Sequence, residues 1–370
     1  MTIFLNMKVV IVCDWLTNMG GGEKVTEEIA KSFGDAPIYT SVVNRDNLSP
    51  YLSKADIHPS KLQGKNEKIL DHKKYFPRMP KAFQKMEIEP CDVLISSSSS
   101  CAKMVKVPEG AIHICYCHTP MRYAWVMEKD YLHTLSWWKR PLAKVLLSYM
   151  RKQDYKTTKG VDYFVSNSEC VKERIKKYYG RDATVIYPNV DISKFPLSNV
   201  DKGYYLVASR LVYYKRIDLA VRACTELNKP LVVVGGGPEL ENLKKIAGPS
   251  VTFLGRVSDE ELVKSVRECR AFLFPGEEDF GIAPIEAMAA GKPVIAFAKG
   301  GALETVEDNK TGVYFDTQSV ESLKDAINRF ENMKFDREYI SNHAKKFASN
   351  VFDKKFKEFV MDCYNKKVEK

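Results

Sequence analysis

Short apolar runs alternate with amphipathic segments along the chain. Residues 7–12 form a continuous apolar run that ends at Asp14, a pattern typical of a strand buried on both faces of a parallel sheet. Three glycines at 20–22 follow, and residues 22–33 then carry their apolar side chains at helical spacing. The pattern therefore predicts a strand, a glycine loop and a helix at the start of the chain.

The same alternation recurs in two series. In the first, apolar runs predict buried strands at 91–98, 111–118 and 161–168. The second begins at Tyr204, and its six apolar runs are separated by amphipathic segments. Strands that alternate with helices favour parallel sheets covered by helices on both faces. The runs of the second series are 204–210, 230–237, 251–255, 271–276, 293–298 and 312–315.

A break in the pattern separates the two series. Residues 184–203 contain two prolines and many small polar residues, which indicates a linker between domains. The 370 residues also suit two domains at roughly 150 residues each. We predict an α/β protein with Rossmann-like domains at 1–186 and 187–351, whose parallel sheets face a central cleft. Ligands of such sheets bind at the carboxyl ends of the strands.

The composition is that of a soluble globular protein, with 45% hydrophobic and 28% charged residues. The nine cysteines are odd in number and form no CxxC pair, which favours reduced, buried thiols. A metal site at Cys115 and Cys117 is the alternative, but no second ligand pair lies nearby in the sequence. No secretory signal or membrane span is visible, so a cytoplasmic location is expected. The formal net charge of +10 favours polyanions, anionic lipids or phosphorylated substrates as partners.

The most informative motif is residues 276–296, GEEDFGIAPIEAMAAGKPVIA, in which seven residues separate Glu278 from Glu286. Gly281 allows close approach of the backbone to a ligand, and the free amides of a helix that begins there form a phosphate site. Glu278 precedes this helix, and Glu286 lies one turn inside it, about 6 Å further along the axis. Two carboxylates placed this way can accept hydrogen bonds from two sugar rings of one extended ligand. The apolar neighbours of Glu286 argue against a merely solvated helix position.

This motif resembles the Glu-x7-Glu signature of glycosyltransferase family 4, and the motifs below occur in that family's order over nearly the whole chain. The resemblance implies the GT-B fold, retention of anomeric configuration, and a last helix at 352–370 that packs back on the first domain. It further implies that the first domain binds the acceptor and the second binds a nucleotide-sugar donor. The donor contacts that it implies in this motif are Glu278 on the sugar, Glu286 on the ribose, and Phe280, Gly281 and Ile282 beside them.

Two cations follow the first strand of the second series, within residues 206–221, LVASRLVYYKRIDLAV. Arg210 and Lys215 lie between that strand and the next helix, where they can hold a diphosphate or remain a pair of surface cations. The family resemblance implies that they neutralise the leaving diphosphate. Because no DxD-like acidic pair lies in a credible metal loop, we predict activity with no metal ion and no other cofactor.

The glycine loop and a histidine mark the first domain. Gly20, Gly21 and Gly22 alone are a weak signal and depart from G-x-G-x-x-G, but the resemblance implies that their loop closes over the donor phosphate and part of the acceptor site. His118 follows a buried strand in CYCHTPMRYAW, and the resemblance implies a catalytic contact with the transferred sugar. HTPMRYAW and VIVCDWLTNMGGGEKV also resemble surface-polysaccharide mannosyltransferases, which favours GDP-mannose as the donor.

Smaller features fit the same family. By resemblance, Gly236 in the glycine run 235–237 shapes the base side of the cleft, and Val257 and Leu262 flank the base. Asn189 and Asp191 match a hinge motif. A turn or packing role is the alternative for each of these residues.

Two basic, aromatic stretches lie in the first domain, from Lys65 to Lys85 and from Tyr131 to Lys152. Adjacent Trp and Lys residues suit a membrane interface, unless Trp137 and Trp138 belong to the interior. A polyprenyl-diphosphate-linked acceptor would explain contact with the inner face of an anionic membrane. We therefore expect a nucleotide-sugar donor, a glycan or lipid-linked acceptor and a membrane surface as partners, and no nucleic acid.

Four other functions fit parts of the sequence. The same fold can use a UDP-sugar, and a GT-B sugar-nucleotide epimerase would change its donor with no acceptor present. An NAD-dependent dehydrogenase is disfavoured by the missing G-x-G-x-x-G motif. A non-catalytic nucleic-acid-binding module would fit the net charge. The presence of all the expected glycosyltransferase site residues argues against a nucleic-acid-binding module: Glu278, Glu286, Arg210, Lys215 and His118.

Overall fold

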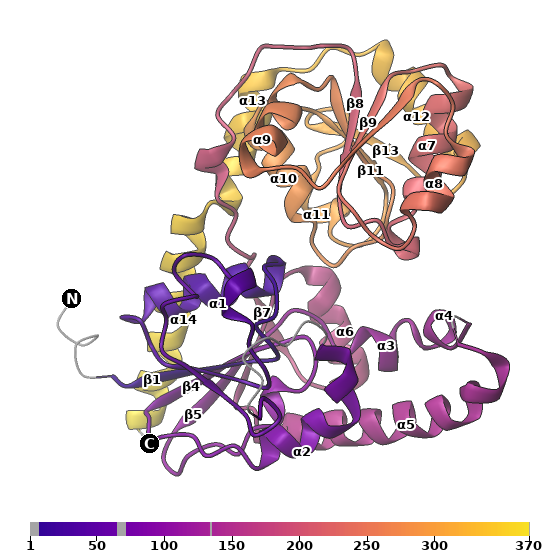
Figure 1. The fold of residues 1–370 in the computed structure, drawn as a ribbon. Coiled ribbons are helices and arrows are strands. Elements are labelled where there is room, and N and C mark those ends of the chain that lie inside the picture. Colours follow the sequence, from indigo (N-terminus) through magenta and orange to yellow (C-terminus); the bar gives the residue numbers. More distant parts are fainter. Residues whose placement is uncertain (1–6, 65–71, 134, 370) are drawn as a thin grey trace. The chain divides into compact units, whose positions relative to one another are not determined.

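A computed structural model describes residues 7–64, 72–133 and 135–369, which divide into two compact α/β units (Figure 1). The first unit runs to Asn189 and includes the segment from Phe352 onward, and the second unit is Val190–Val351. Each unit is built on one sheet of parallel strands, as the alternation of apolar runs and helical segments predicts.

The sheet of the first unit has seven strands in the order β3-β2-β1-β4-β5-β6-β7. The strand order reverses between β1 and β4, and such a reversal is where parallel sheets bind ligands. The strands are β1 (Val9–Cys13), β2 (Ile38–Thr40), β3 (Ile57–Pro59), β4 (Val93–Ser98), β5 (Ile112–Cys117), β6 (Tyr163–Ser166) and β7 (Ala183–Val185). The helices are α1 (Gly21–Ser32), α2 (Met79–Gln84), α3 (Arg122–Trp125), α4 (Glu128–His133), α5 (Arg140–Thr157), α6 (Glu169–Tyr179) and α14 (Ser349–Val368).

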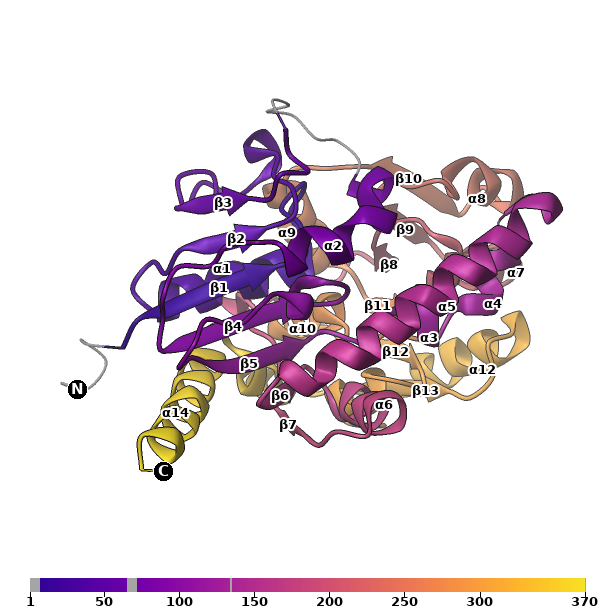
Figure 2. The same cartoon turned by 90° about the horizontal axis from the view of Figure 1, so that it is seen from below.

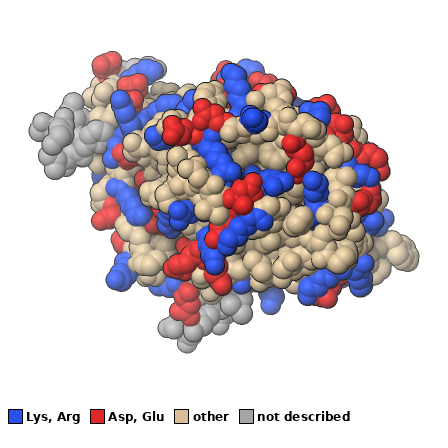
Figure 3. All heavy atoms as spheres, turned by 90° about the horizontal axis from the view of Figure 1, so that it is seen from above, with Lys and Arg blue, Asp and Glu red and all other residues tan. Residues whose placement is uncertain are grey.

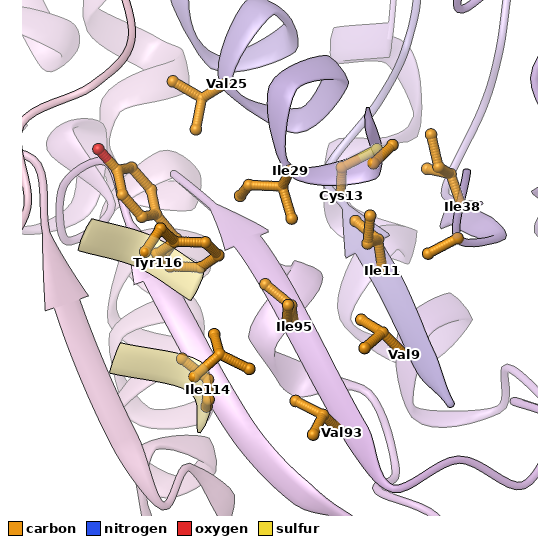
Figure 4. Packing of buried hydrophobic residues seen from close by; sticks show 14 of the residues in the cluster. Val9, Ile11, Cys13, Val25, Ile29, Ile38, Val93, Ile95, Ile114 and Tyr116 are labelled. Atoms are coloured by element: carbon orange, nitrogen blue, oxygen red, sulfur yellow. The ribbon is translucent and has the colours of Figure 1, made fainter. Parts of the chain in front are cut away.

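Successive side chains of a strand point to opposite faces of the sheet, and in this sheet both faces are apolar. Helices therefore cover both of them. On one face, Val9 and Ile11 of β1 pack with α1, and Figure 4 shows Val25 and Ile29 of that helix above them. The helix α14 joins the same cluster through Phe352, Phe356, Val360 and Cys363, spaced for one helix face. On the other face, Val10 and Val12 pack with α2, α3 and α5.

The sheet of the second unit has six strands in the order β10-β9-β8-β11-β12-β13, and its order reverses between β8 and β11. This is the strand order of a doubly wound Rossmann sheet. The strands are β8 (Tyr205–Ala208), β9 (Leu231–Val234), β10 (Val251–Gly255), β11 (Ala271–Phe274), β12 (Val294–Phe297) and β13 (Gly312–Phe315). The helices are α7 (Ile217–Glu226), α8 (Leu240–Ile246), α9 (Asp259–Glu268), α10 (Ile282–Ala289), α11 (Ala302–Thr305), α12 (Val320–Glu331) and α13 (Arg337–Ala344).

One part of the linker prediction is wrong. Residues 184–203 were predicted to join the domains, but Ala183–Val185 form β7, which pairs with β6 at the edge of the first sheet. β7 has only three residues and none of them is fully buried, so its apolar pattern is weak. The reduced state predicted for the thiols agrees with the structure, in which all nine cysteines are free and seven are buried.

Two surface properties bear on the predicted partners. Within the described ranges, no helix combines the length and the apolar character that crossing a membrane requires. On the face drawn in Figure 3, cationic and anionic side chains are interspersed, so the excess positive charge is not gathered there. A cationic partner surface has to be sought away from the face that Figure 3 draws.

Candidate functional site

In the second unit, the strand-order reversal brings two predicted motifs together. β8 and β11 are neighbours in the sheet, and the loops that follow them carry Lys215 and Glu278. Because parallel strands end at the same edge, these loops meet, and Lys215 Nζ lies 2.8 Å from Glu278 Oε1. Each of the two side chains is 22% exposed, so the pair is partly shielded from water yet open to a ligand.

The local backbone conformation places Lys215 at this position. It ends a single 3-10 turn, Tyr213–Lys215, and Arg216 then adopts a left-handed φ of 51° before α7 begins. A Cβ atom on Gly276 would lie 2.8 Å from Lys215 Cα, so only glycine lets the two loops approach this closely. Arg210 lies earlier in the same loop with its side chain exposed.

The loop that carries Glu278 is held from the other side by the loop after β12. The amide of Gly301 donates a hydrogen bond of 2.9 Å to the carbonyl oxygen of Glu278. A Cβ atom on Gly300 would lie 2.3 Å from that carbonyl oxygen, and one on Gly301 would lie 2.3 Å from Phe280 Cα. Sequence reasoning missed this contact, although a glycine pair separated from a strand by two residues signals close backbone approach.

The start of α10 follows the sequence prediction, with one restriction. Gly281 precedes the helix with a φ of 93°, and a Cβ atom there would lie 2.8 Å from the Phe274 ring. Ile282 begins the helix, and Glu286 lies in its second turn, half-buried. Phe280 is buried, 5.7 Å from the Phe347 ring between centroids, so its main chain rather than its side chain can contact a donor.

The glycine run after β9 has a packing role at two of its three positions. Gly235 has a φ of 126°, and a Cβ atom there would lie 1.9 Å from the carbonyl oxygen of Ser209. A Cβ atom on Gly237 would lie 2.2 Å from the carbonyl oxygen of Leu211. These two glycines join the loops after β8 and β9. Gly236 has more room, since its Cβ position lies 3.4 Å from the Arg256 side chain.

Val257 and Leu262 bracket the start of α9. Ser258 caps this helix, and its side chain accepts a hydrogen bond from the amide of Glu261 while the Glu261 carboxylate accepts one from the amide of Ser258. Val257 and Leu262 are both half-buried. The capped helix start therefore fixes the backbone on which both side chains stand.

In the first unit, Asp14 organises the loop after β4. It directly follows β1 and is buried, and burial raises the pKa of its carboxyl group. Its Oδ2 atom accepts the amide of Ser99 at 2.6 Å, and its Oδ1 atom accepts the amides of Cys101 and Ala102 at 2.7 Å each. Sequence reasoning missed this role, although an aspartate after one strand and a serine run after another indicate a polar contact at a sheet edge.

The last two residues of β4, just before this loop, contact His118. The His118 amide donates to the carbonyl oxygen of Ser98 at 2.9 Å, and its Nε2 atom lies 2.8 Å from Ser97 Oγ. Thr26 of α1 approaches the same hydroxyl at 2.9 Å. A Cβ atom on Gly22 would lie 3.6 Å from His118 Nε2. The structure therefore brings the glycine loop and the histidine together at the carboxyl edge of the first sheet.

A second histidine shows what a purely structural role looks like. His113 of β5 is fully buried, and burial lowers its pKa to about 4. Its ring nitrogens bond Ser96 Oγ at 2.8 Å and the carbonyl oxygen of Gly160 at 3.1 Å. His118 differs because it is only half-buried and lies at the strand end.

The amides at the start of α1 already have an acidic partner. Glu23 is half-buried as a residue, and its carboxyl group takes hydrogen bonds from the backbone of Gly20 and of Glu23 itself; a Cβ atom on Gly20 would lie 2.8 Å from Glu23 Oε2. Burial raises the pKa of Glu23 to about 7, and the nearby Asp14 adds to the effect. A phosphate at this loop would therefore meet a carboxyl group that is readily protonated.

This pKa predicts a pH-dependent stability. The folded chain keeps the Glu23 proton up to about pH 7, whereas the unfolded chain loses it near 4.5, so stability falls as pH rises between these values. The Glu23→Gln variant cannot ionise at this position. Its unfolding free energy relative to the parent should therefore rise by about 1–3 kcal/mol from pH 5 to pH 8. Urea unfolding followed by tryptophan fluorescence checks this, with the exposed Glu109→Gln as the control. An equal difference at both pH values would contradict it.

The predicted residues thus form one set in each unit. His118 and the glycine loop gather in the first, and Lys215, Glu278 and the α10 start gather in the second. Within the ranges that the structure describes, no three His, Cys, Asp or Glu side chains lie close enough together to hold a metal ion. This includes the alternative metal site considered at Cys115 and Cys117.

Family models match both halves of the chain. Residues 19–194 match the model "Glycosyltransferase Family 4", and residues 189–347 match "Glycosyl transferases group 1". A GDP-mannose-dependent alpha-(1-6)-phosphatidylinositol monomannoside mannosyltransferase from Mycobacterium tuberculosis is 33% identical over 234 residues, which cover 55% of this chain and 59% of that protein. The human alpha-1,3/1,6-mannosyltransferase ALG2 is 31% identical over 212 residues, covering 47% and 51%. The chain thus aligns with little more than half the length of these relatives.

Solved structures share the fold over almost the full length. HepE from Anabaena, in complex with UDP, superposes with a TM-score of 0.71 and 16% identity, covering 96% of this chain and 100% of that one. The sucrose-phosphate synthase of Thermosynechococcus elongatus gives a TM-score of 0.74 and 17% identity, covering 97% and 99%. With two family models that together span residues 19–347, these matches confirm the predicted family and fold. The chain belongs to glycosyltransferase family 4 and has the GT-B fold.

Proposed function

We propose that this chain is a retaining hexosyltransferase that moves mannose from GDP-mannose to a hydroxyl group of a glycan or a polyprenyl-diphosphate-linked saccharide. The observation that carries the proposal is the pair of Lys215 and Glu278, 2.8 Å apart where the strand order of the second sheet reverses. The similarity to mannosyltransferases that use GDP-mannose supports the choice of donor.

The second unit is assigned the donor. A Lys ammonium has three donors, so Lys215 can keep one on Glu278 and offer the others to phosphate oxygens. Arg210, in the same loop, adds a second cation, and the amides at Gly281 and Ile282 add helix-start donors. Together they stabilise the charge that develops on the departing diphosphate. Glu278 then holds hydroxyl groups of the donor sugar, and Glu286 holds the ribose.

The first unit is assigned the acceptor and a contact with the transferred sugar. His118 makes that contact, and Ser97 fixes the orientation of its ring through the 2.8 Å bond to Nε2. In a same-face displacement the leaving phosphate oxygen takes the proton of the acceptor hydroxyl while the sugar bond to that phosphate breaks. No side chain is therefore assigned as a nucleophile, and the transferred sugar keeps its anomeric configuration.

Calorimetry with GDP, UDP and ADP, with and without chelator, tests the donor assignment. We expect GDP to bind at least about tenfold more tightly than the other two nucleotides. We also expect no loss of affinity or turnover in chelator, because Lys215 and Arg210 would neutralise the diphosphate in place of a metal ion. Preference for UDP, the nucleotide in the HepE complex, would overturn the donor but keep the family. Failure to bind any of the three would contradict transfer itself.

An acceptor-free incubation separates transfer from epimerisation. GDP-mannose should stay unchanged as a sugar nucleotide in the absence of acceptor, and conversion to an epimer would overturn the transferase proposal. An anionic membrane surface belongs to the proposal as a further partner, because a lipid-linked acceptor would be presented there.

A further inference from the structure

Helix α5 carries apolar side chains on two opposite faces. The inner face packs into the first unit through Leu147, Met150 and Asp154, all buried. Opposite it, Leu142, Val145 and Tyr149 are 75%, 68% and 48% exposed. In Figure 2 no other helix or strand is drawn over α5. Within the described part of the first unit, the second face is therefore left exposed.

The preceding turn extends this exposed face. Trp138 lies in the 3-10 turn Trp137–Lys139 and is 64% exposed, and its neighbour Trp137 is 79% exposed. This excludes the interior position considered for both residues from the sequence. We call the residues Trp138, Leu142, Val145 and Tyr149 the outer stripe, since their spacing of four, three and four places them on one side of a helix.

Cations border the outer stripe without exposed acidic residues. Lys139, Lys144, Lys152 and Lys156 are exposed, and Lys139 Nζ lies 4.9 Å from the centroid of the Trp138 ring. The one acidic residue between Trp137 and Thr157 is Asp154, which is buried and paired with Lys103. The exposed surface of α5 thus combines an apolar stripe with lysines, and it carries no acidic side chain.

We propose that the outer stripe and its bordering lysines dock on an anionic lipid surface, with α5 lying in the plane of the membrane. Tryptophan and tyrosine rings, with an apolar body and a polar edge, prefer the boundary between headgroups and acyl chains, and flanking lysines reach the headgroups. Each lysine near an anionic surface strengthens binding roughly fivefold. The lysines and the stripe together supply the two attractions that stable membrane docking needs.

A second copy of the chain fits this surface less well. A symmetric dimer through the outer stripe would place the same patch on itself, which brings Lys144, Lys152 and Lys156 close to the lysines of the other copy. Like charges across an interface oppose association. Charge complementarity therefore favours lipid phosphate over self-association.

The other basic stretch of the sequence contributes less than expected. Phe76 packs against Tyr123, 4.6 Å between ring centroids, and Tyr75 is half-buried, so its aromatic side chains serve the unit itself. Its exposed cations can add attraction, and Lys65 and Lys68 lie outside the described residues. The prediction of a membrane surface is thereby narrowed to α5 and the turn before it.

Docking through α5 is linked to the candidate site of the same unit. Asp154 on the inner face accepts the indole N–H of Trp125 at 2.7 Å, and Arg151 donates to the carbonyl oxygen of Ala124 at 2.9 Å. Both partners belong to α3, which begins four residues after His118. A docked α5 would hold α3 and the loop between His118 and α3 on the side of α5 that faces away from the lipid, one helix from the surface that presents the acceptor. The docking itself does not depend on the proposed donor.

Vesicle flotation tests the proposal. The full chain should bind phosphatidylcholine vesicles that contain about one-third phosphatidylglycerol at least tenfold more tightly than pure phosphatidylcholine vesicles, and salt should weaken the binding. Leu142→Glu with Val145→Glu keeps good helix formers on an exposed face, so it should fold but lose at least about tenfold in binding. Lys144→Gln with Lys152→Gln should weaken binding to the anionic vesicles alone.

The matched control is Val368→Glu, which changes another exposed apolar residue of the same unit, 68% exposed, and should leave flotation unchanged. Equal flotation of the parent and of the variant Leu142→Glu with Val145→Glu would overturn the proposal. So would a concentration-dependent dimer in sedimentation equilibrium that this double variant abolishes, because it would assign the outer stripe to a second copy. Neither flotation nor sedimentation depends on the transferase reaction. Membrane docking can therefore fail or hold independently of the donor tests.

Discussion

Lys103→Ala should destabilise the first unit by about 3–5 kcal/mol, because it strands a buried carboxylate. Both side chains of the pair are fully buried, with Lys103 Nζ 2.5 Å from Asp154 Oδ1 and 2.8 Å from the carbonyl oxygen of Ser100. Burial alone would lower the pKa of Lys103, but the Asp154 carboxylate raises it above the ordinary value, so the lysine stays charged. Asp154 also accepts hydrogen bonds from Trp125 and Tyr179 at 2.7 Å each.

Tryptophan fluorescence reports on this unit alone, because all four tryptophans of the chain, at positions 15, 125, 137 and 138, precede residue 189. Urea unfolding followed by this signal measures the loss. The exposed Lys106→Ala is the control and should change stability by less than about 0.5 kcal/mol. Lys103→Met with Asp154→Asn should recover part of the lost stability, since it removes both charges while the amide oxygen can still accept from Trp125 and Tyr179. A single variant as stable as the parent would show that the buried pair is not needed.

Glu278→Gln should lower turnover on the order of 10²–10³-fold while GDP affinity stays within about threefold. The carboxylate accepts from Lys215 and is assigned to hydroxyl groups of the donor sugar, so its loss weakens sugar positioning. Lys215 keeps its charge in the variant, which leaves its proposed contact with the diphosphate in place. Initial rates at saturating donor and calorimetry with GDP measure the two effects separately.

The neighbouring residue provides a matched control. Glu277 has the same side chain in the same loop, but it pairs with the exposed Lys299 at 3.5 Å rather than with Lys215. Glu277→Gln should therefore keep turnover within about threefold of the parent. If Glu278→Gln lost GDP affinity as strongly as turnover, the division of roles between Glu278 and Lys215 would be wrong.

The sequence predicted the elements whose signal is local. Buried parallel strands such as β4 and β5 are continuous apolar runs, and the helix starts at α1 and α10 carry glycine signals, so their places could be read directly. The short strands β2, β3 and β7 have three residues each, and their pairing depends on neighbours far away in the sequence. The hydrophobic pattern of one segment does not reveal which distant strand it pairs with.

The site followed the same division. Glu278 and Lys215 were found because each lies in a motif, but their contact follows from β8 and β11 being neighbours, which strand order in space decides. The role of Asp14 was missed for the same reason, since its three amide partners lie more than eighty residues away. The two faces of α5 were likewise invisible, because both are apolar and only the fold shows which one is covered.

The contact of Gly235 and Gly237 with the loop after β8 has a consequence for how donor preference can change. A side chain at either glycine would collide with backbone atoms of Ser209 or Leu211, just before or within the segment that leads to Lys215. Exchange of the glycine run for a foreign loop would therefore disturb the segment proposed to bind the diphosphate along with the proposed base side of the site. Under the proposed assignment, nucleotide preference is accordingly easier to change through Val257 and Leu262, whose side chains flank a separately capped helix start.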